Sequence, residues 1–517
     1  MLQVIFLLSL FAVLLSATFF PFGLGFLSFV ALVPLFKAIL SDMPPGVSSS
    51  LREAKVGFWR GWLGGVLFFG ITFYWIPFLP AENVTVPLIM FPAYMLMVAY
   101  LALYLGLFGA LLRLSYANLT RRVVLLAPFM WVVMELLRAR GALGFPWASL
   151  GYSLYQYPSL IQVASLGSVY LVSFLLVVVN ALLYDGLIGR VRFAVAIPSA
   201  AALLVVASLG GKTAIGTSAG AERLTVGLVQ PNIGSSVKWD PRFRRHNFEV
   251  LLELTETLAH AKPDLIVWPE TAAPCHLRQE QAYLGLLIRK VDELKVPLLV
   301  GFPDAVPEED GSITYFNSAA LVLPERGLGT KYDKMHLVPF GERIPYDDVF
   351  PVLKRVNFGE ADFERGTAWT VFELDGKKFG VLICFESIFP ELVRSFKVKG
   401  AEFMLNITND EWFGRSAAPY QHAYMAVFRA VENRMSVARC ANTGISMLID
   451  PWGRVALESG VFTREALAGT IEIVGGETFF SRHGFLLLWP LVGVALLESI
   501  VAFARGFRAS SKSRSLR

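Results

Sequence analysis

Eight apolar segments constrain most strongly how this chain can fold. Most of them approach or exceed the roughly 20 residues that an α-helix needs to cross a bilayer. They lie at 2–19, 22–40, 57–79, 87–112, 123–138, 159–187, 193–210 and 485–504. Only 17% of the residues are charged, against roughly a quarter in soluble globular chains. We therefore predict a polytopic α-helical membrane block of about eight transmembrane helices, the first of which is retained and not cleaved as a signal peptide.

The basic residues indicate how these helices are oriented. They concentrate in alternate loops and in the tail, at Arg52, Lys55, Arg113, Arg121, Arg122, Arg190, Arg192, Arg505, Arg508, Lys512, Arg514 and Arg517. Cytoplasmic loops of membrane proteins carry such an excess. Arg138 and Arg140, beside the loop 139–157, are the exception. We predict that both termini are cytoplasmic, and that the net charge of +5 reflects orientation in the membrane and not a nucleic-acid partner.

Residues 220–475 differ from the rest of the chain. Strand-like runs such as LTVGLVQ, DLIVWPE, PLLVGF, KFGVLIC and EFMLNIT alternate there with helical patterns at 245–261, 279–293 and 418–435. This alternation is typical of an α/β domain. We expect a membrane domain at 1–215 with about seven helices, an α/β domain at 220–475 outside the cytoplasm, and a final transmembrane helix at 484–505.

Three stretches of this domain each end a strand-like run with a reactive side chain. DLIVWPE supplies Glu270, KYDKMHLVPFGE supplies Lys334 and Glu342, and GVLICFESIFPE supplies Cys384 and Glu386. A thiol is a weak nucleophile at neutral pH unless a base or a cation helps it. A carboxylate can take its proton, and an ammonium can stabilise the oxyanion of a tetrahedral intermediate. Glu270, Lys334 and Cys384 are therefore a complete set for acyl transfer.

Each of these residues alone also fits an ordinary structural role. A cysteine at the end of an apolar run is usually part of the core, and His336 and His422 are rival candidates for the base. The histidines and the three cysteines show no metal-ligand spacing, so we expect no metal and no other cofactor. Whether Cys275 and Cys440 pair with each other stays open at this point.

Taken together, the three stretches resemble the motifs of the nitrilase superfamily. WPE at 268–270, KYDKMHLVPFGE at 331–342 and CFESIFPE at 384–391 agree with that superfamily in order and spacing. The resemblance covers about half of the chain. It implies a four-layer αββα sandwich for the α/β domain.

The same resemblance implies a role for each reactive residue. Glu270 would be the general base, Lys334 the stabiliser of the oxyanion and Cys384 the nucleophile. Glu342 matches a second glutamate often described beside this triad, and we expect Glu342 and Glu386 to support catalysis.

The position of the domain in the chain narrows the resemblance. A nitrilase-like domain between a block of membrane helices and one final helix is similar to the apolipoprotein N-acyltransferase family of the bacterial inner membrane. VQPNIGSSVKWD, YFNSA, NITNDEWFG and the membrane-side GFPWASLGY agree with that family. The resemblance implies transfer of an acyl chain from a phospholipid, usually phosphatidylethanolamine, to a cysteine as a thioester, and then to the α-amino group of a diacylglyceryl-cysteine. We expect a monomer that receives both lipid substrates from the bilayer.

Water competes with the amine for such a thioester, so we expect aromatic side chains at the mouth of the site to exclude it. The candidate substrate contacts are Trp239, Asn317, Phe385, Trp412 and Phe413. Phe385 stands where many members of the family have Tyr, so no hydroxyl chemistry is assigned there. A further hypothesis makes the long loop 343–366 a membrane-contacting arm.

The sequence leaves two further alternatives open. Glu135 and Arg138 lie one helical turn apart near the end of a span, and they either pair with each other or support the loop that contains GFPW. The rival functions are a membrane-anchored amidase, which would use water as the acceptor, and a non-enzymatic scaffold whose nitrilase-like domain only binds. The amidase would act independently of phospholipid, and the scaffold would keep its function without Cys384.

Overall fold

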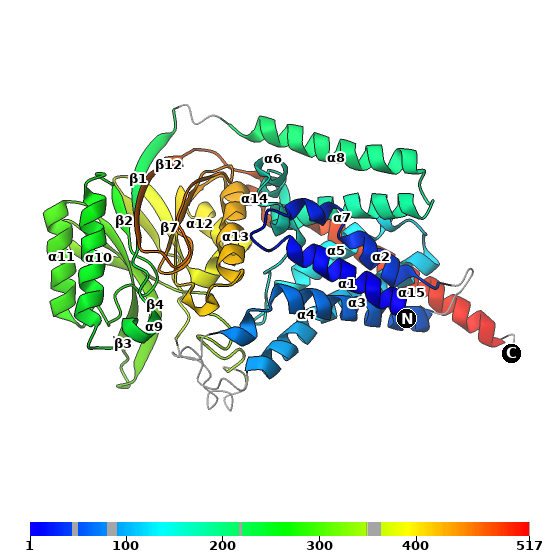
Figure 1. Cartoon of the computed structure of the whole chain (residues 1–517), viewed down its shortest axis with the longest axis horizontal. Helices are drawn as coiled ribbons and strands as arrows, with labels where there is room; N and C mark the ends of the chain where they lie inside the picture. Colours follow the sequence, from blue (N-terminus) through cyan, green and yellow to red (C-terminus); the bar gives the residue numbers. More distant parts are fainter. Residues whose placement is uncertain (44–49, 80–89, 217–219, 348, 350–362, 516–517) are drawn as a thin grey trace. The chain divides into compact units, whose positions relative to one another are not determined.

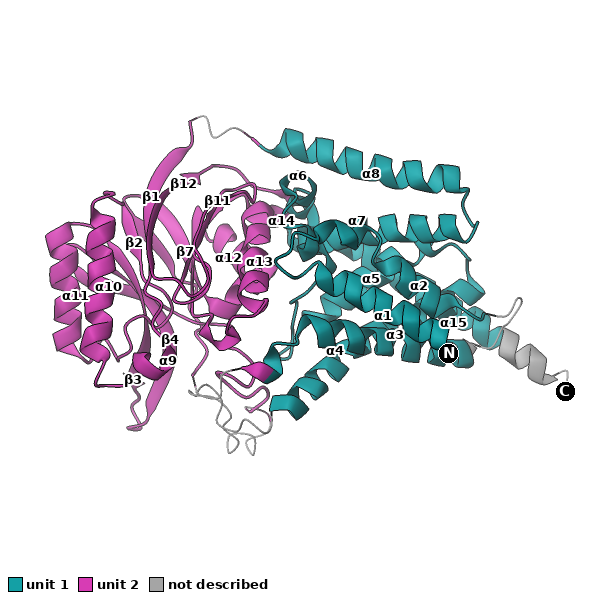
Figure 2. Ribbon diagram, in the orientation of Figure 1, with its two compact units in different colours: residues 1–77, 88–215, 483–517 teal, residues 78–87, 216–482 magenta. Residues whose placement is uncertain are grey.

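The computed structural model describes residues 1–43, 50–79, 90–216, 220–347, 349 and 363–515 (Figure 1). Contacts within the chain divide it into two compact units (Figure 2): unit 1 is residues 1–77, 88–215 and 483–517, and unit 2 is residues 78–87 and 216–482. Of the arm suggested for the loop 343–366, residues 348 and 350–362 lie outside the described residues. The membrane contact of this arm stays a prediction.

Unit 1 is built from apolar helices. Those described helices that are long and apolar enough to cross a membrane cover Leu51–Phe78, Met90–Asn118, Ala164–Leu187, Phe193–Ala214 and Phe479–Arg508. They correspond to α3 (Ser50–Thr72), α4 (Met90–Asn118), α7 (Ala164–Leu187), α8 (Phe193–Ala214) and α15 (Leu488–Ser515). Shorter helices occupy the other predicted segments: α1 (Leu2–Ala17), α2 (Leu32–Leu40) and α5 (Ala127–Arg138). A helix thus lies in each of the eight predicted segments, and five of these helices reach spanning length.

Helices α3 and α4 approach each other closely because glycines line their contact. Gly57, Gly61 and Gly65 repeat every four residues along α3, which places them on one face of the helix. A Cβ atom on Gly57 would lie 2.2 Å from the carbonyl oxygen of Gly109, and one on Gly61 would lie 2.1 Å from that of Leu105. Small residues of this kind let helix backbones pack together inside a membrane, where burial of apolar surface contributes little.

Glu135 and Arg138 on α5 hold the loop that follows the helix. Arg138 Nη1 donates hydrogen bonds to the carbonyl oxygens of Phe145 at 2.9 Å and Trp147 at 2.5 Å. Glu135 Oε1 accepts a hydrogen bond from the backbone N–H of Leu150 at 2.7 Å. Both charged side chains are buried. Support of the GFPW loop, the second of the two alternatives above, is therefore confirmed.

Unit 2 contains two six-stranded sheets. The first runs, in spatial order, β12 (Glu465–Ile473), β1 (Glu222–Gln230), β2 (Leu265–Val267), β3 (Leu298–Pro307), β4 (Ile313–Leu323) and β5 (Gly327–Asp333). The second runs β11 (Val455–Glu458), β10 (Met447–Ile449), β9 (Ser436–Ala441), β8 (Phe403–Thr408), β7 (Lys377–Ile383) and β6 (Val371–Leu374). β1, β2 and β3 are parallel neighbours, and so are β7, β8 and β9. The outer strands pair antiparallel.

Helices cover the outer face of each sheet (Figure 1). α10 (Arg244–Ala259) and α11 (Gln281–Leu294) pack on the first sheet, and α12 (Pro390–Val398) and α13 (Ala418–Asn433) pack on the second. The inner faces meet where β1 and β12 contact β9. The central strands β7 and β8 are buried on both faces and read as nearly continuous apolar runs, as parallel strands in such layers do. The predicted αββα sandwich is confirmed.

Candidate active site

The three residues predicted to form the catalytic triad each follow a strand of unit 2. Glu270 comes after β2, Lys334 directly after β5 and Cys384 directly after β7. Cys384 has a φ of +52°, and Thr271, next to Glu270, has a φ of +46°. Residues with a side chain rarely adopt this left-handed conformation, and those that do cluster at functional sites. Sharp turns therefore follow both strands at the point where a reactive group is expected.

The carboxylate of Glu270 is buried and held by donors on three segments. Its Oε1 accepts a hydrogen bond from Asn317 Nδ2 at 2.8 Å and lies 3.4 Å from Lys334 Nζ. Its Oε2 accepts a hydrogen bond from the backbone N–H of Asn409, which follows β8, at 2.8 Å. These contacts fix the orientation of the carboxylate, as a general base requires.

Lys334 is almost completely buried between two carboxylates. Its Nζ lies 2.8 Å from Glu342 Oε1, and Glu342 Oε2 accepts a hydrogen bond from the backbone N–H of Val338 at 2.8 Å. Burial lowers the pKa of Lys334, but the charges of Glu342 and Glu270 outweigh this effect and raise the pKa above its ordinary value. Lys334 is therefore a cation at neutral pH, as the stabiliser of an oxyanion must be.

The thiol of Cys384 needs a base. Burial raises its pKa, and the carboxylate of Glu270 raises it further, while Lys334 lowers it; the net pKa lies above the ordinary thiol range. The resting nucleophile is therefore a neutral thiol and not a thiolate. These couplings also place Cys384 within electrostatic reach of both Glu270 and Lys334, so the structure brings the three predicted residues together.

Glu386 ties the loop that carries Lys334 to the end of β7. Its Oε1 accepts hydrogen bonds from the Tyr332 hydroxyl at 2.8 Å and from the backbone N–H groups of residues 335 and 336 at 2.7 and 3.1 Å. Its Oε2 accepts the backbone N–H of Ile383 at 2.8 Å. Burial raises the pKa of Glu386 to about 7. The side chain thus fixes the nucleophile and the cation relative to each other.

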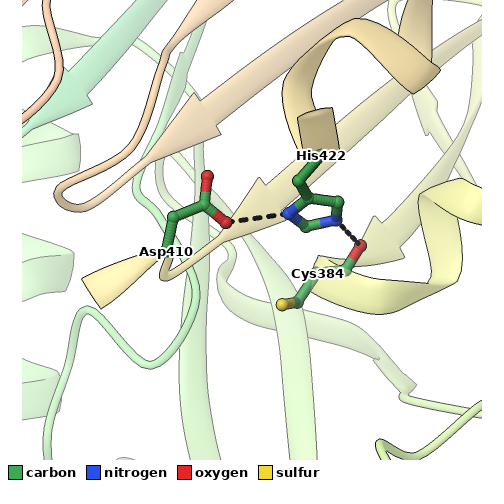
Figure 3. Close-up of side chains that lie close together, drawn as sticks. All are labelled: Cys384, Asp410 and His422. Carbon is green, nitrogen blue, oxygen red and sulfur yellow. Dashed lines mark hydrogen bonds and ion pairs between the residues drawn. The ribbon is translucent and has the colours of Figure 1, made fainter. Parts of the chain in front are cut away.

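A buried network that the sequence indicated only in part lies behind Cys384. His422 Nδ1 lies 2.8 Å from Asp410 Oδ1, and His422 Nε2 lies 3.2 Å from the main-chain oxygen of Cys384 (Figure 3). Arg439 Nη2 donates to Asp410 Oδ2 at 2.7 Å. Burial raises the pKa of Asp410, but Arg439 and His422 outweigh it, so that the pKa falls to about 2. The signal for Asp410 was its position just after the buried strand β8.

The remaining histidine and cysteine candidates have other surroundings. The ring of His336, the other rival base, packs on Phe389 with centroids 4.7 Å apart. Cys275 and Cys440 are free thiols, and Cys440 Sγ donates to the main-chain oxygens of residues 229 and 267, both at 3.2 Å. The open question of their pairing is thus answered by two buried, unbridged cysteines.

Among the described residues, one group could hold a metal ion: Cys384, Asp410 and His422, whose ligand atoms lie within 4.8 Å of one another. A thiol, an imidazole and a carboxylate are ligands that zinc accepts. Here, however, Asp410 and His422 already bind each other, and the guanidinium of Arg439 beside them repels a cation. The residues therefore do not favour a metal.

Three of the predicted substrate contacts lie on two connected segments. Trp239, 42% exposed, follows α9 (Ser235–Lys238), and the half-buried Trp412 and Phe413 lie in η9 (Glu411–Phe413). Glu411 joins the two segments through hydrogen bonds from Ser235. Its Oε1 accepts one from the backbone N–H at 2.6 Å, and its Oε2 accepts one from the hydroxyl at 2.7 Å. The segment that carries Trp239 is thereby fastened to the one that carries Trp412.

The other two predicted contacts lie deeper. The ring of Phe385 is buried beside Phe389, with centroids 5.2 Å apart. Asn317 is buried on β4 and donates to Glu270 and to Glu342 Oε1, the latter at 3.1 Å. Sequence reasoning missed the buried Lys238, whose Nζ donates to the main-chain oxygen of Glu270 at 3.2 Å. Only its position beside Trp239 in VQPNIGSSVKWD could have suggested it.

Both parts of the chain match known families. Residues 225–475 match the carbon-nitrogen hydrolase family, and residues 11–182 match the apolipoprotein N-acyltransferase N-terminal domain. The chain is 35% identical to the apolipoprotein N-acyltransferase of Geobacter metallireducens, over 95% of this chain and 94% of that protein. It is 34% identical to the apolipoprotein N-acyltransferase of Azotobacter vinelandii, over 90% of this chain and 92% of that protein. Nit3 of Saccharomyces cerevisiae, a solved structure of the nitrilase superfamily, is 22% identical with a TM-score of 0.38, over 48% of this chain and 90% of that one.

Proposed function

The chain belongs to the apolipoprotein N-acyltransferase family, and from this premise we propose that Cys384, Glu270 and Lys334 carry out its reaction. The protein is an acyltransferase of the last step of lipoprotein maturation, a multi-pass protein of the inner membrane that uses a phospholipid donor and a lipoprotein acceptor. The observation that carries the assignment is the contact of Lys334 with both Glu270 and Glu342 beside a protonated Cys384.

In the first half of the proposed reaction, Glu270 removes the proton from the Cys384 thiol as sulfur attacks the ester carbonyl of the phospholipid. Lys334 stabilises the oxyanion of the tetrahedral intermediate. When the intermediate collapses, the carbon–oxygen ester bond breaks, and the lysophospholipid alkoxide leaves with the proton held by Glu270. The raised pKa of Cys384 supports this sequence, because the thiol ionises only as the base takes its proton.

In the second half, the α-amino group of a diacylglyceryl-cysteine attacks the thioester. Glu270 takes a proton from the amine, the carbon–sulfur bond breaks, and the Cys384 thiolate recovers the proton. The product is an amide, and the enzyme returns to its starting state. The linked segments that carry Trp239 and Trp412 would exclude water, which would otherwise hydrolyse the thioester.

The finer features of the proposal concern substrate and placement. The donor would be phosphatidylethanolamine and the enzyme a monomer. The catalytic domain, residues 220–475, would stand on the periplasmic side between a membrane domain at 1–215 and a last helix at 484–505, with both termini in the cytoplasm. The distribution of Lys and Arg between alternate loops supports this orientation.

A reconstituted assay tests the function. Vesicles would contain the protein and phosphatidylethanolamine with a labelled acyl chain, and a diacylglyceryl lipopeptide would be added as acceptor. We expect label in an amide of the lipopeptide with the wild-type protein and none with Cys384→Ala. A lipopeptide whose amine is already acetylated is the matched control and should stay unlabelled. Release of labelled fatty acid without labelled lipopeptide would instead indicate a hydrolase.

A further inference from the structure

Cys384, Asp410 and His422 look at first like a Cys–His–Asp triad, because their functional atoms lie within 4.8 Å of one another. The directions of the side chains differ from a triad. His422 Nε2 is aimed at the main-chain oxygen of Cys384, 3.2 Å away, while the sulfur lies on the opposite side of Cys384 from that oxygen (Figure 3). His422 Nδ1 faces Asp410 at 2.8 Å. Both ring nitrogens are engaged, so neither is directed at the thiol proton.

The imidazole is held in place from several elements. Asp410 Oδ1 also accepts a hydrogen bond from Thr408 Oγ1 at 3.0 Å, and Asp410 Oδ2 accepts one from Arg439 on β9. Arg439 Nη2 lies 3.1 Å from His422 Nδ1 as well. The main-chain oxygen of Cys384 can only accept a hydrogen bond, so its contact with the ring requires a proton on Nε2. Asp410, His422 and Arg439 are completely buried. The ring therefore has no freedom to turn toward the sulfur.

The group that His422 holds is the strained residue itself. Cys384 has a φ of +52°, and its main-chain oxygen faces two donors, His422 Nε2 at 3.2 Å and Ser387 Oγ at 3.1 Å. A backbone of this kind is strained and persists only where its surroundings determine it. On the preceding side, Glu386 holds the backbone N–H of Ile383. The turn is thus fastened before and after the nucleophile.

We infer that His422 is a positioning residue: held by Asp410 and Arg439, it donates its Nε2–H to the main-chain oxygen of Cys384 and keeps the left-handed turn that directs the thiol to Glu270 and Lys334. The inference rests on the proposed function only in naming acylation as the reaction affected. The alternative is that His422 is itself the base.

Two variants, whose side-chain amides extend to different lengths, distinguish a positioning residue from a base. In His422→Gln, the amide N–H replaces Nε2–H and can still reach the oxygen of Cys384. In His422→Asn, the shorter amide replaces Nδ1 and reaches only Asp410. For each protein, the acylation rate of Cys384 by phosphatidylethanolamine vesicles would be followed by intact mass from pH 6 to 9, at several lipid concentrations. Alkylation of Cys384 by iodoacetamide would be followed without lipid.

Positioning predicts that His422→Gln keeps most of the maximal acylation rate and the wild-type acid limb of the pH profile. His422→Asn should lose about 100-fold, the cost of a misplaced group, with unchanged apparent KM and slower alkylation. Equal losses in the two variants, or a displaced acid limb in His422→Gln, would overturn the inference. If His422→Asn does not fold, His422→Gln alone decides by the same criteria. Failure of the proposed function would give a different result. The wild-type protein would then not be acylated, but iodoacetamide would still alkylate Cys384 more slowly in His422→Asn than in the wild-type protein.

Discussion

The ammonium nitrogen of Lys334 lies 2.8 Å from Glu342 Oε1, closer than the 3.4 Å that separates it from the expected base. Glu342 therefore determines where the cation stands, and it leaves Glu270 free to exchange a proton with the thiol. Because Glu342 also accepts the backbone N–H of Val338, its own carboxylate is fixed. The site is built as a cation between one carboxylate that positions it and another that reacts.

Replacement of Glu342 tests whether this carboxylate positions the ammonium group of Lys334. Glu342→Gln removes a charge that raises the pKa of Lys334, so we expect the variant to lose acylation rate at alkaline pH where the wild-type protein keeps it. The maximal rate should fall by about 10- to 100-fold because the cation is displaced. Acylation would be measured by intact mass between pH 7 and 10. Glu364→Gln is the matched control, since Glu364 pairs with Arg343 and not with Lys334; equal effects of the two changes would contradict the account.

The two charges around Cys384 should shift its reactivity in opposite directions. Glu270 raises the pKa of the thiol and Lys334 lowers it. At pH 8, iodoacetamide should therefore alkylate Cys384 faster than wild type in Glu270→Gln and more slowly in Lys334→Ala, because only the thiolate reacts. Both changes should nevertheless abolish or greatly slow acyl transfer. Slower alkylation in Glu270→Gln would show that the carboxylate does not act on the thiol.

Glu386 should make stability depend on pH. Its pKa is about 7 in the folded protein, above the ordinary value of 4.5. Between these values the folded state keeps a proton that the unfolded state has lost, so the free energy of unfolding should fall as the pH rises from about 5 to about 7. Glu386→Gln lacks this titration. Thermal unfolding of both proteins in one detergent at pH 5, 6, 7 and 8 should show their Tm difference shrinking with pH; a constant difference would refute the assignment.

The contact of α3 with α4 can be tested by a single methyl group. In Gly61→Ala the new Cβ would lie 2.1 Å from the carbonyl oxygen of Leu105, so the helices must separate. Overpacking of this kind costs about 1–3 kcal/mol. Gly210→Ala on α8 is the control, because nothing lies within 4 Å of its Cβ position. We expect a lower Tm in detergent for Gly61→Ala alone, and equal Tm values would contradict the close packing.

The parts of the structure that were predictable from sequence are those encoded locally. β7 and β8 are nearly continuous apolar runs, and the reactive residues Glu270 and Cys384 come just after strands, so their presentation could be inferred from neighbouring residues. The edge strand β12 was not predicted, because its partly exposed sequence EALAGTIEI lacks such a run. Transmembrane helices were predicted from length and apolar character, which the bilayer requires of any span.

The network behind the nucleophile could not be predicted in the same way. Asp410 follows β8, His422 lies inside α13 and Arg439 lies within β9, so nothing in the local sequence pairs them. They meet because β8 and β9 are parallel neighbours and α13 packs on β9. His422 was recognised only as a rival base without a partner, since its partner depends on the register of the sheet.

The most direct test of the account is the intact mass of the purified protein after incubation with phosphatidylethanolamine and no acceptor. We predict an added mass of one acyl chain on Cys384, absent in Cys384→Ala and in Glu270→Gln, and removed when a diacylglyceryl lipopeptide is supplied. An unmodified protein that still produces N-acylated lipopeptide, or an adduct that persists in Cys384→Ala, would contradict the thioester at Cys384.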